Sequence, residues 1–463
     1  MLTRIEIDGF KSFESFAVDL APFVVVLGSN ASGKSNLFDA IDLLSKLAGG
    51  GVSEAMKGMR GEPAELFRRT PGGRADRMQL AVELLIDPVV HDPWGNEISL
   101  THTRLRYEIG LALRDTARGG SQVVVIHESA KPILNKCDPW VAAIKPSPAF
   151  RKRFLRYKRQ NDFLSTKTEE DGLLFNVHHD GHQGRTRPAK AASASVLSTI
   201  TNADFPHLFA VREELRNWRL LQLDPAMLRR PTPEGADDTL QPNGANLAAV
   251  LARIKQNTAR DDQPSGALAA IAAELNALIP GVKSLDAGFD EASREYRARL
   301  VMRDGVPFSS RVISDGTLRV LALLTMLHDP RHRGVVCFEE PENGVHPGRL
   351  RDFVRTLRSM VTAPGDIETE LDMPLSQLLL NSHSPVVLSA LLSFEDSGQR
   401  QRVLLADMVS VVDPSSREVR RRSRIRPVHM SPQGRLIDFE DASDHDVSTY
   451  EVQQILETTA ADA

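Results

Sequence analysis

Short apolar runs rich in β-branched residues alternate along this chain with segments in which apolar residues recur every three or four positions. The first such run, residues 23–27, predicts a buried strand. A helix is expected directly after it, because apolar residues follow at helical spacing, namely Leu37, Ala40, Ile41, Leu43 and Leu44. Residues 1–7 alternate between apolar and polar side chains, which is typical of a strand with one buried face.

Further strands are expected on both sides of the middle of the chain. Residues 77–87, 103–113 and 123–127 predict strands that extend a first lobe. Near the other end, buried strands are expected at 334–338 and 376–380, and a late strand or hairpin at 403–412. A long apolar helix is expected from Leu318 to Leu327.

The middle of the chain, residues 129–292, has a more helical and irregular pattern. Amphipathic helices are expected over 208–221, 247–254 and 268–278, and several prolines interrupt them. Heptads are not sustained, so a long coiled coil is not expected. We interpret this stretch as a compact, mainly helical insertion that transmits the state of the rest of the protein to a partner.

Composition narrows the class of protein. With 463 residues, 41% hydrophobic and 25% charged, the chain is expected to be a soluble globular protein of two or three domains. Its net charge of −4 gives no global basic field, so any contact with DNA must come from a local patch. The two cysteines have no metal-like spacing and fit a reducing compartment. With neither a signal peptide nor an apolar run long enough to span a membrane, we expect a cytoplasmic bacterial protein.

Residues 28–36 read GSNASGKSN and form a complete phosphate-binding loop between the first strand and the first helix. In this context, backbone N–H groups of the loop surround phosphate oxygens, and the helix N-terminus adds a partial positive charge. Lys34 is expected to reach the β- and γ-phosphates, and the Ser35 hydroxyl to bind Mg²⁺. The candidate nucleotide-binding residues are Asn30, Ala31, Ser32, Gly33, Lys34, Ser35 and Asn36.

A second block of chemistry follows the apolar run at 334–338, which ends in Glu339 and Glu340. A buried strand that delivers carboxylates at its C-terminal end suits a site that holds Mg²⁺ and polarises a water molecule. We assign Glu339 to the metal and Glu340 to the attacking water as general base. The alternative is a strand followed by an acidic turn with no catalytic role.

Two further blocks complete the pattern. Ser314, Asp315 and Gly316 precede the long apolar helix and offer a second phosphate-binding helix start, for which the alternative is an ordinary N-cap. One γ-phosphate and two such helix ends suggest a head-to-tail dimer in which each protomer closes the other's nucleotide. His383 follows the run at 376–380 and is a candidate for contact with the γ-phosphate, although a histidine at a strand end is often structural.

These four blocks, in this order, resemble the ABC-type ATPase heads of the SMC and RecF proteins, and most closely the OLD-like (AAA_21) group of stand-alone bacterial ATPases. The matching motifs are SDGTLR at 314–319, EEPE at 339–342, SHSP at 382–385 and the opening residues 7–13. The resemblance covers roughly residues 1–128 and 293–410. It implies an α/β, ABC-type P-loop ATPase head, with a mixed-sheet lobe and a helical lobe.

The same resemblance implies roles for particular residues. Ser35 and Glu339 hold Mg²⁺, Glu340 is catalytic, His383 is the switch histidine, and the block at 314–316 acts in trans on the partner's ATP. Lys11 and Arg4 are expected near the nucleotide. The chain departs from SMC heads in having Glu339 where they have aspartate and Ala31 where they often have glycine, and no Q-loop glutamine is assigned.

The implied domains are an ATPase head at 1–128 and 293–430, an insertion at 129–292 and an acidic C-terminal tail at 431–463. The OLD-family nucleases add a Toprim domain after the ATPase, which requires an Asp-x-Asp at a strand end. Residues 444–446 match the Asp-x-Asp motif, but they lie in a polar stretch without a preceding buried strand, so we expect an ATPase without its own nuclease.

Two basic runs and a histidine group leave several interpretations open. Residues 151–159 interleave arginine and lysine with aromatic residues, and fit nucleic acid, an acidic protein partner or a solvated helix face. The run from Arg420 to Arg426 is interpreted as a solvated face that flanks a hairpin. His178, His179 and His182 lack a completing ligand for a metal and are interpreted as a polar loop.

Three functions are therefore compared. The first is an ATPase that acts as the sensor subunit of a bacterial, antiviral defence complex with a separate effector, such as a Toprim-like nuclease. The second is a RecF-like ATPase that acts on DNA. The third is a scaffold that uses ATP as a clamp with negligible turnover.

Overall fold

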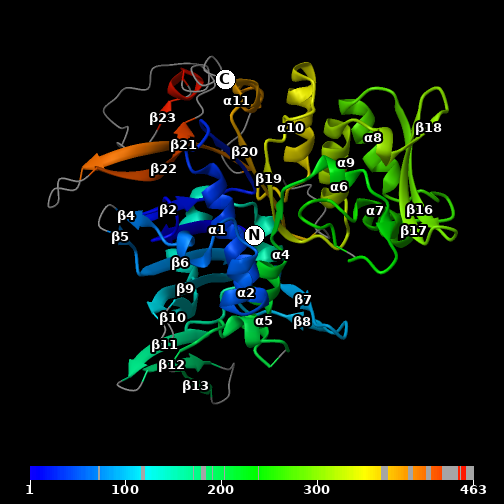
Figure 1. Cartoon of the computed structure of the whole chain (residues 1–463). Coiled ribbons are helices and arrows are strands. Elements are labelled where there is room, and N and C mark those ends of the chain that lie inside the picture. Colours follow the sequence, from blue (N-terminus) through cyan, green and yellow to red (C-terminus); the bar gives the residue numbers. More distant parts are fainter. Residues whose placement is uncertain are drawn as a thin grey trace.

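The computed structural model describes residues 1–70, 73–115, 120–169, 172–178, 184–189, 191–202, 204–237, 239–365, 374–394, 400–412, 419–429, 447–448 and 450–454. The elements in these ranges form two large sheets and a smaller third sheet, with helices between and around them (Figure 1). None of the helices in these ranges is both long and apolar enough to cross a membrane.

The first sheet has eight strands, paired antiparallel throughout. In spatial order they are β13 (Arg185–Ala189), β12 (Gly172–Val177), β11 (Leu164–Glu169), β10 (Ser121–Pro132), β9 (Arg104–Asp115), β6 (Arg77–Leu85), β1 (Leu2–Asp8) and β2 (Phe16–Asp19). The strands expected at 1–7, 77–87, 103–113 and 123–127 are therefore confirmed as β1, β6, β9 and β10.

The second sheet contains the strands that carry the candidate site. In spatial order they are β14 (Arg219–Leu221), β19 (Gly334–Glu339), β20 (Ser376–Ser382), β3 (Phe23–Leu27), β21 (Gln401–Val412), β22 (Val419–His429) and β23 (Val447–Ser448). The first five run parallel, and β22 turns back antiparallel to β21. Since parallel strands end at one edge, the residues after β3, β19 and β20 meet there.

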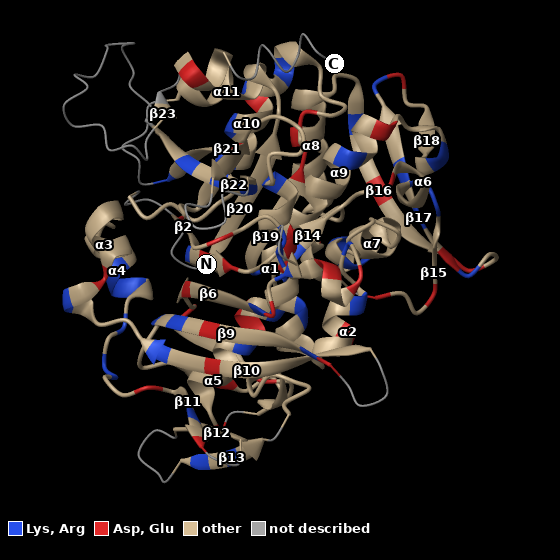
Figure 2. Cartoon of the chain, turned by 60° about the vertical axis from the view of Figure 1, so that its left-hand side comes forward, with Lys and Arg blue, Asp and Glu red and all other residues tan. Residues whose placement is uncertain are grey.

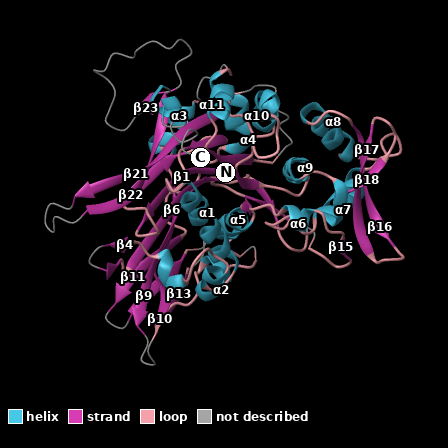
Figure 3. Cartoon of the chain, turned by 45° about the horizontal axis from the view of Figure 1, so that its top comes forward, coloured by secondary structure: helices cyan, strands magenta, loops and turns pink. Residues whose placement is uncertain are grey.

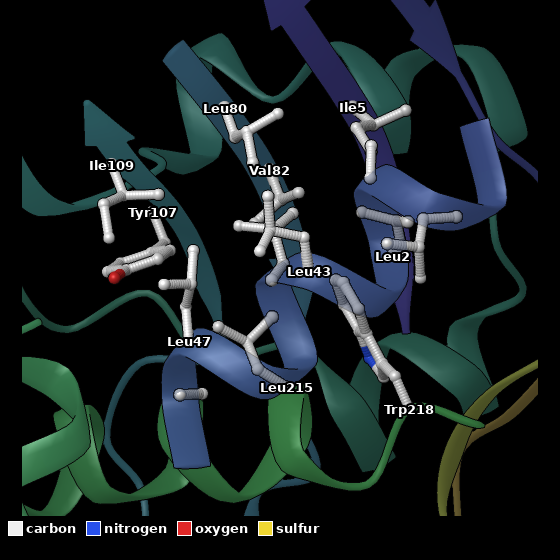
Figure 4. Close-up of a cluster of buried hydrophobic side chains, with 14 of the residues drawn as sticks. Leu2, Ile5, Leu43, Leu47, Leu80, Val82, Tyr107, Ile109, Leu215 and Trp218 are labelled. Atoms are coloured by element: carbon white, nitrogen blue, oxygen red, sulfur yellow. The ribbon is translucent and has the colours of Figure 1, made fainter. Parts of the chain in front are cut away.

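Strand β3 is fully buried because both of its faces are covered. Val24 and Val26 pack into the core beneath the first sheet, together with helices α1 (Lys34–Gly49) and α5 (Pro206–Arg216). Figure 4 shows side chains of this core. On the opposite face, Phe23, Val25 and Leu27 pack with residues of α9 (Asp315–Leu327), α10 (Leu350–Ser359) and α11 (Pro385–Leu392). This packing explains why the run at 23–27 is apolar at every position.

The third sheet is made of β15 (Thr232–Pro233), β17 (Glu295–Met302), β16 (Val282–Asp290) and β18 (Pro307–Ser309). It is accompanied by α6 (Pro225–Leu228), α7 (Leu247–Thr258) and α8 (Leu268–Leu278). Figures 1 and 3 show it on the side of the molecule away from β9, β10 and β11. The shorter elements are α2 (Val52–Lys57), α3 (Pro139–Ile144), α4 (Pro148–Phe154), β4 (Arg69–Thr70), β5 (Gly73–Arg74), β7 (Val89–His91) and β8 (Glu97–Ser99).

Residues 129–292 do not form the separate, mainly helical insertion that the sequence suggests. Strands β11, β12 and β13 extend the first sheet, β14 joins the second, and the proposed boundary at 129 falls inside β10. The expected helices do form as α5, α7 and α8, but α5 ends at Arg216 because residues 219–221 pair with β19. Strands β11 and β13 carry many exposed polar side chains, which weakens their hydrophobic signal.

The acidic tail expected at 431–463 lies outside the described residues, except for 447–448 and 450–454. The Asp-x-Asp at 444–446 lies outside them as well, as do His179 and His182.

Candidate ATP site

The phosphate-binding loop connects β3 to α1, as expected. Its backbone has positive φ angles at Ala31 (62°) and Gly33 (98°), and Gly33 is the residue that caps the start of α1. A Cβ at Gly33 would overlap the hydroxyl of Ser423 on β22, so a side chain is excluded there by space as well as by backbone conformation. The loop therefore packs against the hairpin formed by β21 and β22, and the N-terminus of α1 faces the site.

Lys34 is folded into the loop that precedes it. Its ammonium group donates hydrogen bonds to the carbonyl oxygens of Gly28 (2.6 Å) and Ser29 (2.7 Å). Burial lowers the pKa of Lys34, while the charges of Glu340, Glu342 and Glu339 act in the opposite direction. The Lys34 ammonium group is therefore in the same site as the carboxylates at 339, 340 and 342.

Glu339 is the last residue of β19 and Glu340 follows it, at the edge where the parallel strands end. The side-chain amide of Asn381 donates to Glu339 Oε1 (3.2 Å). The backbone N–H of Glu340 donates both to the carbonyl oxygen of Asn381 (3.0 Å) and to its side-chain oxygen (3.1 Å). Asn343 donates to Glu340 Oε2 (2.7 Å), and Glu340 itself has a positive φ of 52°. Asn381 of the neighbouring strand β20 therefore holds the Glu339 carboxylate and the Glu340 backbone, while Asn343 holds the Glu340 carboxylate.

His383 lies directly beside Glu340. Its Nδ1 is 3.5 Å from Glu340 Oε1 and 3.9 Å from Glu342 Oε1. Ser382 donates a short hydrogen bond to Glu342 Oε1 (2.5 Å), and burial raises the pKa of Glu342. The end of β20 and the loop after β19 are thus joined by three consecutive residues of β20 and its extension, residues 381–383.

One cavity of about 640 Å³ brings the loop and the carboxylates together. Its lining residues are Asn30, Ala31, Ser32, Gly33, Lys34, Ser35, Asn36, Arg60, Leu221, Gln222, Leu223, Arg319, Glu339, Glu340 and Asn381. All seven candidate nucleotide-binding residues belong to this wall, and so do both carboxylates assigned to metal and catalysis. His383 is not part of the lining and reaches it through Glu340.

The block at 314–316 occupies the start of α9. The Ser314 hydroxyl accepts a hydrogen bond from the backbone N–H of Thr317 (3.3 Å), and Asp315 forms an ion pair with Arg229. Gly316 packs against Gly344, so a Cβ at Gly316 would overlap the Cα of Gly344 and lie 2.6 Å from its carbonyl oxygen. Within one chain this block therefore contacts the loop that carries Glu340, and its role in trans remains a prediction.

Six residues of the cavity wall were not identified as site residues from the sequence, and three of them, Arg60, Arg319 and Asn381, contact Glu339. Arg60, in the segment after α2, contacts Glu339 Oε1 (3.4 Å) and Asp39 Oδ1 (3.2 Å). Arg319, on α9, donates to the backbone oxygen of Glu339 (3.3 Å). Asn381 donates to the Glu339 carboxylate and accepts from the backbone N–H of Glu340. Arg319 is the last residue of the SDGTLR motif and Asn381 directly precedes the SHSP motif, which is a usable signal, whereas Arg60 has no motif around it.

The two basic residues expected near the nucleotide have different surroundings. Lys11 forms an ion pair with Asp39 on α1 (2.6 Å), and Asp39 also contacts Arg60 of the cavity wall. Arg4 instead pairs with Glu6 (2.7 Å) and Asp19 (2.8 Å) on the first sheet. Lys11 is thus connected to the site through one residue, and Arg4 belongs to a surface network of β1 and β2.

Much of the basic run at 151–159 is engaged within its own segment. Arg151 donates to the carbonyl oxygen of Pro146 (3.0 Å), and Arg156 to those of Lys152 (2.7 Å) and Leu155 (3.1 Å). Arg159 donates to the carbonyl oxygens of 161 and 162 (3.0 and 3.1 Å). These guanidinium groups stabilise the turns around α4, which gives the run a structural role whether or not a partner binds it.

Two family models match the chain. Residues 147–389 match the family described as "AAA domain, putative AbiEii toxin, Type IV TA system" (AAA_21), and residues 1–67 match the family described as "AAA ATPase domain" (AAA_15). None of the curated proteins compared with the chain matches it.

Several solved structures are similar to the chain at low sequence identity. One is the SMC head bound to the C-winged helix domain of ScpA, with 12% identity, a TM-score of 0.47, and coverage of 91% of this chain and 97% of that one. Another is the SMC head domain with an extended coiled coil bound to the C-terminal domain of ScpA, derived from Pyrococcus furiosus, with 10% identity, a TM-score of 0.47 and 99% of both chains covered. A third is the SMC head domain from Thermotoga maritima, with 10% identity, a TM-score of 0.37, and 92% and 99% covered.

Proposed function

Because the chain belongs to the AAA domain family that its residues 147–389 match, we propose that it binds ATP with Mg²⁺ in the cavity described above and hydrolyses it. The observation that carries the proposal is the composition of that single cavity wall. It combines a complete phosphate-binding loop with two carboxylates, Glu339 and Glu340, and with Asn381 between them. This combination of a phosphate cradle and strand-end acids fits phosphoryl transfer to water.

The residues present fit both the nucleotide and the metal. The positive φ of Gly33 and the absence of space for a Cβ leave a cradle of backbone N–H groups at the start of α1, which suits phosphate oxygens. The Ser35 hydroxyl and the Glu339 carboxylate are oxygen donors, the type that Mg²⁺ prefers. When bound, Mg²⁺ neutralises charge on the phosphates. Lys34 exchanges its hydrogen bonds to the carbonyls of Gly28 and Ser29 for contacts with phosphate.

Glu340 is the residue that accepts a proton from the attacking water. Asn343 and Asn381 fix its carboxylate and its backbone, so that it is oriented before the substrate arrives. His383, 3.5 Å from Glu340, orients the same water and contacts the γ-phosphate. Arg60 and Arg319 supply positive charge on the remaining wall of the cavity.

We further propose that two copies of the chain assemble head-to-tail around ATP. Ser314, Asp315 and Gly316 of one protomer then close the nucleotide bound to the loop of the other. The start of α9, with its N-cap serine, supplies the backbone N–H groups for this contact. Size-exclusion chromatography with light scattering tests the assembly, which should form with ATP in the Glu340→Gln variant and not without nucleotide.

At the level of the cell, we propose a cytoplasmic sensor subunit of a bacterial antiviral complex, with a separate effector such as a Toprim-like nuclease. The family description names a toxin–antitoxin system, which supports a chain that acts with a second protein. Affinity purification from the native host, with and without ATP, should recover that effector. Recovery of no second protein under either condition would contradict the sensor role.

The catalytic proposal is tested by the substitution Glu340→Gln, which keeps the shape of the side chain and removes its basicity. Phosphate release should fall by about 10²- to 10⁴-fold, whereas the affinity for a fluorescent ATP analogue should be preserved. Lys34→Ala is the matched control, because it should lose nucleotide affinity itself. An unchanged rate in Glu340→Gln refutes the assignment, and a wild type without turnover, with or without its partner, favours the ATP clamp.

A further inference from the structure

The hairpin of β21 and β22 carries an unusual row of arginines. Strand β22 reads VRRRSRIRPVH, so that arginine occupies every second position from 420 to 426. Since side chains alternate between the faces of a strand, Arg420, Arg422, Arg424 and Arg426 share one face, and Ser423 lies on the other. The contacts agree, because Asp407 of β21 pairs with both Arg424 and Arg426.

The charge on this face is strongly positive. Within residues 401–412 and 419–429, the described parts of the two strands, Asp407 is the one carboxylate, against the four arginines of the row. Arg424 keeps 40% of its side chain exposed even though it is paired, and Arg426 keeps 16%. Figure 1 shows the hairpin extending outward from the body beside β2, and Figure 2 marks its basic residues in blue.

The opposite face of the hairpin is attached to the ATP site. The hydroxyl groups of Ser423 and Ser12 are 2.7 Å apart, and the backbone N–H of Ser423 donates to the carbonyl oxygen of Ser12 (3.0 Å). A Cβ at Gly33 would overlap the Ser423 hydroxyl. In the same way, a Cβ at Gly28 would overlap the carbonyl oxygen of Ala406 on β21. A ligand held by the arginine row therefore lies one strand thickness from the phosphate-binding loop.

We propose that this arginine row binds the sugar–phosphate backbone of double-stranded DNA. Alternate residues of a strand are about 6.6–6.8 Å apart, which is twice the rise of about 3.4 Å per phosphate along one strand of the duplex. Guanidinium groups match phosphate oxygens through paired hydrogen bonds and stay charged at every physiological pH. A two-stranded ribbon also has the width that a DNA major groove admits.

Two features favour a duplex over other ligands. Residues 401–412 and 419–429 contain no Phe, Tyr or Trp, so the ribbon lacks the stacking side chains with which proteins hold single strands. A regular row with a constant two-residue spacing suits the regular repeat of a nucleic-acid backbone better than the irregular charges of an acidic protein surface. The inference goes beyond ATP hydrolysis, and it does not depend on turnover.

The test measures binding of the full-length protein, without nucleotide, to a fluorescent 30-base-pair duplex of arbitrary sequence by anisotropy, at several KCl concentrations. In Arg420→Gln/Arg422→Gln, the slope of log K against log [salt] should fall by about 1.8, at about 0.9 for each phosphate that the protein no longer neutralises. Extrapolated from 1 M salt, this corresponds to an affinity loss of about 30-fold at 0.15 M salt. Arg422→Lys should keep the slope, because it keeps the charge.

A matched control is available on β17, where Arg297 and Arg299 have the same two-residue spacing but have acidic neighbours. Arg297 contacts Asp290 (3.2 Å) and Glu295 (3.6 Å), and Arg299 is paired in register with Asp286. Arg297→Gln/Arg299→Gln should leave DNA affinity and salt slope unchanged. All variants are compared by thermal melting, so that a loss of binding is scored only in folded protein.

Several outcomes would overturn the proposal. One is an unchanged slope in Arg420→Gln/Arg422→Gln, and another is an equal loss in the control variant. A third is displacement of the duplex by poly-glutamate of equal charge at equal concentration, which would point to an acidic protein partner instead. Since no ATP is present, a failed ATPase assay has no bearing on this result.

Discussion

The substitution Gly316→Ala tests whether the start of α9 has a role inside its own chain. The added Cβ would lie 2.6 Å from the carbonyl oxygen and 2.8 Å from the carbonyl carbon of Gly344. The nearest atom to the added Cβ is the Cα of Gly344, at 2.3 Å. Carbon atoms pack best at about 3.5 Å or more, so the two backbones must separate by about 1.2 Å. Gly344 has a φ of 100° and is held by its own turn, so it has little freedom to move away.

Two magnitudes follow from this overlap. Forcing an extra carbon into a closely packed contact costs typically about 1–3 kcal/mol, and we expect the upper end because both partners are backbone. The loop that would move also carries Glu340, and a displacement of about 1 Å can lower a rate by about 10²-fold. We therefore expect Gly316→Ala to lose about 3 kcal/mol of unfolding free energy and to lower kcat by about 10- to 100-fold, with ATP affinity nearly unchanged.

The assay combines urea unfolding, followed by tryptophan fluorescence, with phosphate release and light scattering. Gly288→Ala on β16 is the control, because nothing lies within 4 Å of a Cβ there, and its unfolding free energy should stay within about 0.5 kcal/mol of the wild type. If Gly316→Ala unfolds like the wild type and loses only its ATP-dependent assembly, the contact with Gly344 is no constraint and Gly316 acts in the partner alone.

Three further substitutions have definite expected outcomes. Asn381→Ala removes the hydrogen bond to the Glu339 carboxylate, so the unfolding free energy measured in urea should fall by about 1.5–3 kcal/mol. The Mg²⁺ concentration needed for turnover should also rise, and an unchanged Mg²⁺ profile would contradict this prediction. Burial lowers the pKa of His207 to about 4, so between about pH 6.5 and 4 the unfolded chain binds a proton that the folded chain does not, and stability is lost as the pH falls through this range. His207→Gln should remove up to about 3 kcal/mol of that loss. Equal pH slopes of stability in the variant and the wild type would refute this prediction. Arg104→Leu leaves the buried Asp138 carboxylate without its ion-pair partner and should cost about 3–5 kcal/mol of unfolding free energy. The double variant with Asp138→Asn should partly restore it, and a cost under about 1 kcal/mol would show that the ion pair is dispensable.

The parts of the fold that could be predicted are those specified by local sequence. The run at 23–27 and the helix after it are confirmed as β3 and α1. In each of them, the spacing of apolar residues over a short stretch of sequence is enough to indicate the element. Strands β11, β12 and β13 were missed. The exposed polar residues of β11 and β13 hide the alternation, and each strand of this edge is added by pairing with the one before it, β11 with β10, β12 with β11 and β13 with β12. Patterns of apolar residues along the chain therefore identified the buried strands and missed the edge of the first sheet, where β11, β12 and β13 lie.

The candidate site divides along the same line. The phosphate-binding loop, Glu339, Glu340 and His383 belong to contiguous motifs, and the parallel sheet brings them within one edge. Arg60 was missed because its role depends on the contacts with Asp39 and Glu339, which no spacing along the chain encodes. The row at 420–426 was interpreted as a solvated face, and only the pairing with β21 reveals that its alternate members share one side.

The position of β3 in the second sheet has a consequence for biosynthesis. Val25 is paired on one side with Leu380 and on the other with Val403, and Gly33 is packed against Ser423. The loop therefore emerges from the ribosome long before either of its flanking strands. Until those strands follow, β3 is an uncovered apolar strand, exposed to wrong pairing or to chaperones. The proposed ATP site is therefore complete only after β20, β21 and β22 have been made and have paired or packed around β3 and its loop.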